Sequence, residues 1–183
     1  RNIRKSNDSG VRLKGAFNQS RTYGYNFMIG NGNGAKNETD RYKLIQGNIW
    51  VKMFDQRLYL ELFGDYNDGE NNRYITTTKS FCAWKTRKYT IALELVHQTR
   101  ADIGLDGRNQ TLFGWSTFAH SDLIPERLRV FGKLDFYDPD VYLQNESRQQ
   151  SSSPFDELFY TVGFDYTPIP NIHFMPNVYT NLY

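Results

Sequence analysis

The residues best suited to catalysis or metal binding are scattered along the chain. His97, His120 and His173 are far apart in sequence, with no close metal-binding spacing and no serine or cysteine nucleophile beside them. Cys82 is the single cysteine, so it has no partner for a disulfide or a thiolate metal site, and we interpret it as a small apolar residue. We therefore predict no enzyme activity, no metal site and no cofactor.

Two short motifs look like ligand-binding loops but lack the required spacing. The glycines of residues 30–34 stand at every second position and open no helix, unlike a dinucleotide-binding loop. The stretch DYNDGENN at 65–72 is similar to a calcium loop, but Thr76 occupies the twelfth position, where such a loop needs an acidic ligand. We predict that both stretches are polar loops.

Charged side chains instead follow a period of two. In QRLYLELFGDYN at 56–67, the leucines fall on one face of an extended strand, and Arg57, Glu61 and Asp65 fall on the other. The same alternation in other segments predicts a charged face that lines a water-filled pore. The predicted pore-lining residues are Arg12, Lys14, Lys52, Arg57, Glu61, Asp65, Arg73, Lys79, Arg127, Arg129 and Lys133. A basic excess in a narrow lumen favours anions, whereas mutual pairing of the charges would leave little selectivity.

About ten predicted strands, and no amphipathic helix, carry these positions. Their spans are 10–18, 21–30, 41–54, 57–67, 73–85, 88–99, 109–120, 127–137, 157–167 and 171–182. Most exceed the roughly five or six residues of a soluble strand and match the roughly 9 to 11 that cross a bilayer.

The connections between these strands alternate in length. Short turns are predicted at 19–20, 55–56, 86–87 and 168–170, and longer polar connections at 31–40, 68–72, 100–108 and 138–156, with 121–126 intermediate. This asymmetry predicts an all-β, antiparallel up-and-down transmembrane β-barrel that forms a single domain over 1–183. The connection 138–156 either folds into the lumen or contacts an outside partner.

Aromatic residues at the predicted strand ends form two girdles, as expected at the two interfaces of a membrane. The girdle residues are Tyr23, Tyr25, Trp84, Tyr89 and Tyr166 at the short-turn end and Tyr66, Tyr74 and Phe136 at the long-loop end. Between the girdles the same face carries Ile45, Ile49, Val51, Leu58, Leu60, Leu62, Ile91, Leu93, Val130, Leu134 and Val162. We expect this band to contact lipid.

The topology and composition set further expectations. Both chain ends fall on the long-loop side, so we expect an internal piece of a barrel of twelve or more strands, because complete bacterial barrels have both ends on the other side. No apolar run reaches the roughly 18 residues of a membrane-spanning helix. The net charge is +2 without a Lys/Arg run, which argues against nucleic acid as a partner.

Three stretches resemble the porin-like barrels of Bacteroidota outer membranes, which are distantly akin to the phosphate-selective porins O and P. They are YGYNFMIGNGNG at 23–34, RLYLELFGDYNDG at 57–69 and DELFYTVGFDYTPIPNIHFMPNVY at 156–179. The resemblance implies a trimeric diffusion channel for small polar solutes. Members of the family have longer chains that begin after a signal peptide and close with a final strand, and this sequence departs from both features.

We therefore expect a passive channel in a bacterial outer membrane, in contact with the lipid bilayer and lipopolysaccharide, as a homotrimer or in a larger envelope complex. The alternative is a plugged structural or partner-binding barrel of such a complex. A soluble lipocalin-like barrel would reverse the two faces, with apolar side chains inside.

Overall fold

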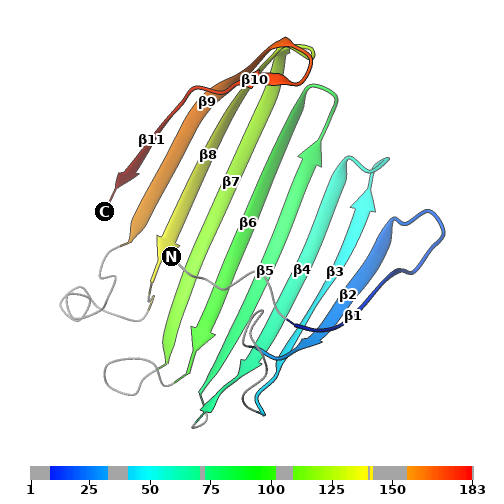
Figure 1. Ribbon diagram of the computed structural model, residues 1–183, viewed down its shortest axis with the longest axis vertical. Helices are drawn as coiled ribbons and strands as arrows, with labels where there is room; N and C mark the ends of the chain where they lie inside the picture. The colour runs from blue at the N-terminus through cyan, green and yellow to red at the C-terminus, as the bar shows by residue number, and fades with distance from the viewer. Residues whose placement is uncertain are drawn as a thin grey trace.

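The computed structural model describes residues 9–32, 41–70, 73–101, 109–139, 141 and 156–182. These residues form one antiparallel sheet in which β1 to β10 each lie beside their neighbours in sequence, and β11 pairs with β9 (Figure 1). The strands are β1 Gly10–Ala16, β2 Tyr23–Gly30, β3 Leu44–Met53, β4 Leu58–Asp68, β5 Tyr74–Lys85, β6 Tyr89–Arg100, β7 Gln110–Ile124, β8 Leu128–Asp138, β9 Glu157–Ile169, β10 Ile172–Phe174 and β11 Asn177–Leu182. The predicted all-β, antiparallel up-and-down architecture is confirmed.

The sheet is open. Within the described ranges, β1 pairs only with β2, and β11 pairs only with β9. The two strands therefore lie at opposite edges of the sheet in Figure 1.

Tight connections lie at one end of the sheet, which we call the turn end; the opposite end is the loop end. In the β3–β4 connection, the Arg57 amide donates to the Phe54 carbonyl at 3.1 Å, and Asp55 and Gln56 have φ of 55° and 65°. These values correspond to a two-residue type I′ hairpin turn, whose twist matches that of the strands. The turns predicted at 19–20, 55–56 and 86–87 are all present.

The connection predicted at 121–126 is shorter than expected. β7 continues through Ser121 and Asp122, which pair with Val130 and Arg129 of β8. Only Pro125 and Glu126 remain as the central turn residues, and the Arg127 amide donates to the Ile124 carbonyl at 3.0 Å. Proline followed by a residue with φ of 62° is the arrangement of a type II turn. Part of the polar stretch that was predicted to be a loop therefore belongs to β7.

The last predicted strand is divided into two, which gives eleven strands instead of ten. β10 and β11 both pair with β9 and are separated by Met175 and Pro176. Proline has no amide hydrogen to donate to the ladder, although the Pro176 carbonyl still accepts a bond of 3.2 Å from the Phe164 amide. The pairs Phe174–Tyr166 and Asn177–Gly163 lie on the same register, so β11 continues the direction of β10.

Cross-strand pairing sorts the strand side chains onto two faces. One, the apolar face, runs through pairs such as Ile49–Leu62, Leu93–Thr117 and Val162–Val178. The other, the polar face, runs through pairs such as Trp50–Glu61, Glu94–Ser116 and Arg129–Asp165. In the described strands, every Asp, Glu, Lys and Arg lies on the polar face except Asp68 and Asp138, which end β4 and β8 at the loop end.

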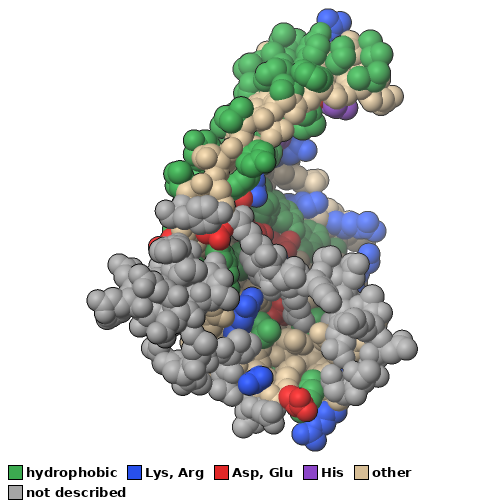
Figure 2. All heavy atoms as spheres, turned by 60° about the vertical axis from the view of Figure 1, so that its left-hand side comes forward, with side chains coloured by type: hydrophobic (Ala, Val, Ile, Leu, Met, Phe, Trp, Pro, Cys, Tyr) green, Lys and Arg blue, Asp and Glu red, His purple; other side chains and the backbone are tan. Residues whose placement is uncertain are grey.

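Exposure is the reverse of that in a soluble sheet protein. In β6, Ile91 and Leu93 are 50% and 42% exposed, while Thr90, Ala92 and Glu94 on the polar face are half-buried. Figure 2 shows hydrophobic side chains over the outer surface of the upper arm of the sheet and charged side chains on its hollowed side. Few apolar side chains among the described residues are buried: Met28, Leu44, Ala101, Leu112 and Pro139. No second layer covers the apolar face there.

Two further points complete the fold. Among the residues that the structure describes, no helix has the length and apolar character needed to cross a membrane. The connections predicted at 31–40, 68–72, 100–108 and 138–156 fall in whole or in part outside the described residues, as does the serine-rich stretch 147–154.

Candidate functional site

The charged residues predicted to act together share the polar face. The register places Arg12, Lys14, Lys52, Glu61, Asp65, Lys79, Arg129 and Lys133 there directly. Arg57 and Arg127 lie in turn-end connections, where their carbonyls accept the amides of Lys85 and Thr167, and Arg73 immediately precedes β5. The sheet therefore brings side chains from most of its strands onto one surface.

Two ion pairs lie along β7 and β8 on this surface. Arg129 Nε lies 2.6 Å from Asp122 Oδ1 across the β7–β8 pair, and Lys133 Nζ lies 2.6 Å from Asp135 Oδ2 along β8. Their side chains stay partly exposed, so each pair contributes at most about 1 kcal/mol to stability. Asp122, which was not among the predicted pore-lining residues, was missed because its segment was interpreted as a loop.

The three histidines have different surroundings on the sheet. His97 lies on the apolar face, whereas His120 is on the polar face beside Phe118, with ring centroids 5.6 Å apart. His173 Nδ1 lies 2.9 Å from Asp165 Oδ1. No group of three or more potential metal-ligating side chains occurs among the described residues.

Aromatic rings on the polar face were not included in the predicted site. The Tyr59 ring lies 6.5 Å from that of Trp50 and 5.9 Å from that of Phe81, centroid to centroid. The Tyr59 hydroxyl donates a short hydrogen bond to Glu61 Oε2. The phase of the strand alternation already assigns these rings to the polar face, but their residue types alone suggest the apolar one.

Two lysines lie over rings of this same group. Lys52 Nζ is 5.5 Å from the centroid of Trp50, and Lys79 Nζ is 4.8 Å from that of Phe63. Such cation–π contacts contribute about 0.5 to 1 kcal/mol at exposed sites. Trp50, Tyr59, Phe63 and Phe81 thus form an aromatic strip on the polar face, and charged groups flank it.

The predicted girdle residues all lie on the apolar face, near its two ends. At the turn end, the Phe17 ring lies 5.6 Å from Tyr23 and 5.0 Å from Tyr25. At the loop end, the centroids of Tyr66 and Tyr74 are 5.7 Å apart, and those of Trp115 and Phe136 are 6.1 Å apart. The remaining predicted members lie at the turn end: Trp84, Tyr89 and Tyr166.

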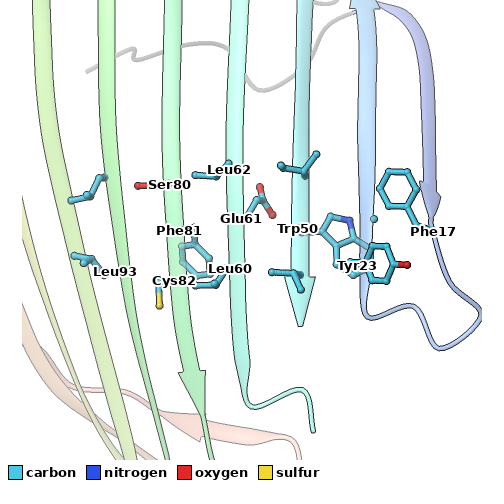
Figure 3. A pocket seen from close by; sticks show the side chains of 14 residues that line it. Phe17, Tyr23, Trp50, Leu60, Glu61, Leu62, Ser80, Phe81, Cys82 and Leu93 are labelled. Atoms are coloured by element: carbon cyan, nitrogen blue, oxygen red, sulfur yellow. The ribbon is translucent and has the colours of Figure 1, made fainter. Parts of the chain in front are cut away.

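A shallow groove of about 620 Å³ interrupts the apolar face. Its floor is formed by the small side chains of Ser80 and Cys82 on β5, with Leu60 and Leu62 on one side and Leu93 on the other (Figure 3). The exposed thiol of Cys82 therefore lies among leucines, as expected for a small apolar residue.

The two faces allow different chemistry. The polar face can hold water, ions and hydrogen-bonding solutes along its length, while the apolar face offers only dispersion contacts. No protein-family model, curated protein or solved structure matches this chain.

Proposed function

We propose that this chain forms part of the wall of a bacterial outer-membrane β-barrel that acts as a passive channel for small polar solutes. The observation that carries the proposal is the reversed distribution of side chains, with aliphatic residues exposed on the outer side and charged residues, many of them half-buried, on the hollowed side. A large exposed apolar surface marks contact with lipid or with another protein. In this proposal the apolar face contacts lipid and the polar face lines a water-filled lumen.

Strand length supports a membrane location. β4, β6 and β9 have 11, 12 and 13 residues, which corresponds to a rise of about 36 to 43 Å at roughly 3.3 Å per residue. Tilted by about 40°, such strands span roughly 28 to 33 Å, slightly more than the apolar band of about 25 Å in outer-membrane barrels. Aromatic pairs near both ends of the apolar face match the two membrane interfaces.

The curvature also favours this proposal over a soluble lipid carrier. A lipocalin-like barrel needs its apolar side chains on the concave side, around the ligand. Here the hollowed side carries the charges instead. The remaining alternative is a plugged or partner-binding barrel. The aromatic strip of Trp50, Tyr59, Phe63 and Phe81 supports it, because another chain could pack on these rings.

The proposal includes a preference for anions at the turn end. The strands and turns at this end carry Arg21, Lys52, Arg57, Lys85, Arg87, Lys88, Arg127 and Arg129 against Asp55, Glu61, Asp122, Glu126 and Asp165. A cationic excess in a lumen with low-dielectric walls attracts anions. From the porin-like resemblance, the proposal also includes assembly as a homotrimer or in a larger envelope complex, surrounded by lipid and lipopolysaccharide.

Single-channel conductance in planar bilayers, with a salt gradient across the membrane, tests the proposal. We expect discrete open steps and a reversal potential that favours anions. Conductance with a cation preference would contradict the selectivity but not the channel. A folded protein that changes mobility on heating in an electrophoresis gel, yet never conducts, would contradict the channel and favour the plugged barrel.

A further inference from the structure

A second feature of the polar face is a hollow of about 520 Å³ formed by β6, β7, β8 and β9. Its volume falls in the range of small-molecule sites, roughly 300 to 1,000 Å³. Residues that line it include Glu94, Ser116, Asp135, Tyr137, Glu157 and Phe159. The hollow is distinct from the basic turn-end surface.

The register explains the shape of the hollow. Glu94, Ser116 and Asp135 are consecutive cross-strand partners on β6, β7 and β8. Neighbouring strands lie about 4.8 Å apart, so the Cα atoms of the two acidic residues are separated by about 10 Å. Ser116 and Gly114 on β7 form a low floor between them, and longer side chains on β6 and β8 form the walls.

The two carboxylates retain the capacity to accept hydrogen bonds. Lys133 binds only Oδ2 of Asp135, at 2.6 Å, and Oδ1 of Asp135 is buried with no hydrogen-bond partner among the described residues. Glu94 forms no hydrogen bond or ion pair with any described residue. The Glu94 carboxylate is half-buried and lines the hollow, so a ligand that supplies N–H donors can bind it there. The lack of a donor is costly for the buried Oδ1 of Asp135, and a ligand ammonium reaches that atom only when a neighbouring side chain moves.

The charge balance of the lining also favours a cation. Three carboxylates, those of Glu94, Asp135 and Glu157, line the hollow against two cationic groups, Lys133 and Arg100. Lys133 is already engaged with Asp135, and Arg100 Nε donates to Gln98 Oε1 at 2.8 Å near the loop end. The lining therefore carries a net charge of −1, and Glu94 is its carboxylate without a cationic partner among the described residues.

Aromatic rings provide the remaining wall. Phe159 is the cross-strand partner of Asp135, and Tyr137 lies two residues beyond Asp135 on β8. Ring faces attract organic cations and also pack against hydrocarbon chains. A metal ion would use neither ring, and no cluster of three or more metal-ligating side chains exists among the described residues.

We propose that this hollow binds a small organic amine, with ammonium groups at Glu94 and Asp135 and the hydrocarbon part against Tyr137 and Phe159. The inference rests on the proposed function, because the polar face must be open to water for a solute to reach the hollow. It makes the lumen selective along its length: anions concentrate at the turn end, and amines bind nearer the loop end.

Isothermal titration calorimetry with 1,4-diaminobutane tests the site on the whole protein folded in detergent. We expect Glu94→Gln to weaken binding roughly ten-fold or more, because it removes a charge that no other described residue uses. Glu61→Gln is the matched control: Glu61 lies in the same register row but outside the hollow, and we expect unchanged affinity. Uncharged 1,4-butanediol should bind no variant.

Three results would overturn the site: equal loss in both variants, unchanged binding in Glu94→Gln, or equal binding of the diol. The mobility shift on heating confirms that each variant is folded before titration. Conductance without amine then separates the two proposals. Conductance without diamine binding would contradict the amine site and support the channel. Diamine binding with the expected variant pattern but no conductance would support the amine site and contradict the channel.

Discussion

The two faces of β4 are held by different kinds of contact. Leu58, Leu60 and Leu62 lie opposite mostly apolar side chains across the sheet, such as Val51, which is the partner of Leu60; the exception is Ser80, opposite Leu62. On the other face, the Tyr59 hydroxyl donates to Glu61, and Lys79 from β5 lies over the ring of Phe63. The apolar face depends on a general property, apolar character, and the polar face depends on particular partners.

This difference suggests that the apolar face determines the stability of the sheet and the polar face determines its selectivity. Dispersion contacts are non-directional, so one aliphatic residue can replace another on the apolar face at a small cost in stability. A charged residue on that face would cause a large loss of stability in lipid. Directed contacts on a wet face contribute little to folding, because water competes for each of them. Substitutions on the apolar face should therefore change stability, and substitutions on the polar face should change the ions or solutes that are bound.

The largest expected effect comes from Leu60→Arg. In the proposed orientation Leu60 lies in the lipid-facing band, one same-face position inside the girdle row of Leu58 and Trp84. A charge costs roughly 2 to 4 kcal/mol at the midplane and less toward the interfaces, so we expect a loss of roughly 2 kcal/mol or more in the free energy of unfolding in lipid. Urea titration of vesicle-folded protein, followed by tryptophan fluorescence, measures this loss.

Glu61→Gln, at the next position, is the control for that measurement. We expect its unfolding free energy to change by less than about 0.5 kcal/mol, while its reversal potential moves toward anions. A silent Leu60→Arg together with an unfolded Glu61→Gln would mean that the faces are assigned the wrong way round.

A smaller effect should separate two glycines on opposite faces. A Cβ at Gly24 on the polar face would lie 2.4 Å from the Gly15 carbonyl oxygen and 2.5 Å from Cζ2 of Trp50. Gly24→Ala should therefore cost about 1 to 3 kcal/mol through overpacking. The same urea titration applies.

Gly64, on the apolar face, provides the matched substitution. The nearest atom to its added Cβ is the Thr77 carbonyl oxygen at 4.0 Å, an ordinary contact. Gly64→Ala should be neutral or slightly stabilising, because alanine loses less backbone entropy than glycine on folding. Equal losses at both positions would show that the close packing of Trp50 over Gly24 does not limit stability.

The strands and their faces could be predicted from the sequence because a slip of one residue exchanges the faces completely. β6 was expected at 88–99 and spans Tyr89–Arg100, with its charges on the expected side. Errors arose where residue type and context conflict. Ser121 and Asp122 have loop-like side chains, but pairing with β8 keeps them in the ladder.

The site was less predictable, because alternation assigns a face but not the neighbours on it. The row of Glu94, Ser116 and Asp135 depends on the register of two hairpins, and that register follows from the number of residues in each turn. Shortening the expected connection at 121–126 places Arg129 opposite Asp122. The sequence therefore predicts which residues are polar-facing, but the grouping into a hollow and an aromatic strip requires the turns.

The smallest expected effect is at the pair Arg129 and Asp122. Their atoms are 2.6 Å apart, but the side chains are 45% and 24% exposed, so solvent screens the attraction. A double-mutant cycle with Arg129→Gln and Asp122→Asn should give a coupling of about 0.2 to 1 kcal/mol that decreases as salt is added.

The same variants should still change ion selectivity, because each alters the charge of the polar face by one unit. Arg129→Gln should move the reversal potential toward cations, and Asp122→Asn should move it toward anions. A coupling above about 2 kcal/mol would instead indicate a dry, low-dielectric environment, since only desolvated pairs reach that strength. That result would contradict a water-filled lumen at the turn end and would favour the plugged barrel, so this weakest interaction discriminates directly between the two functions.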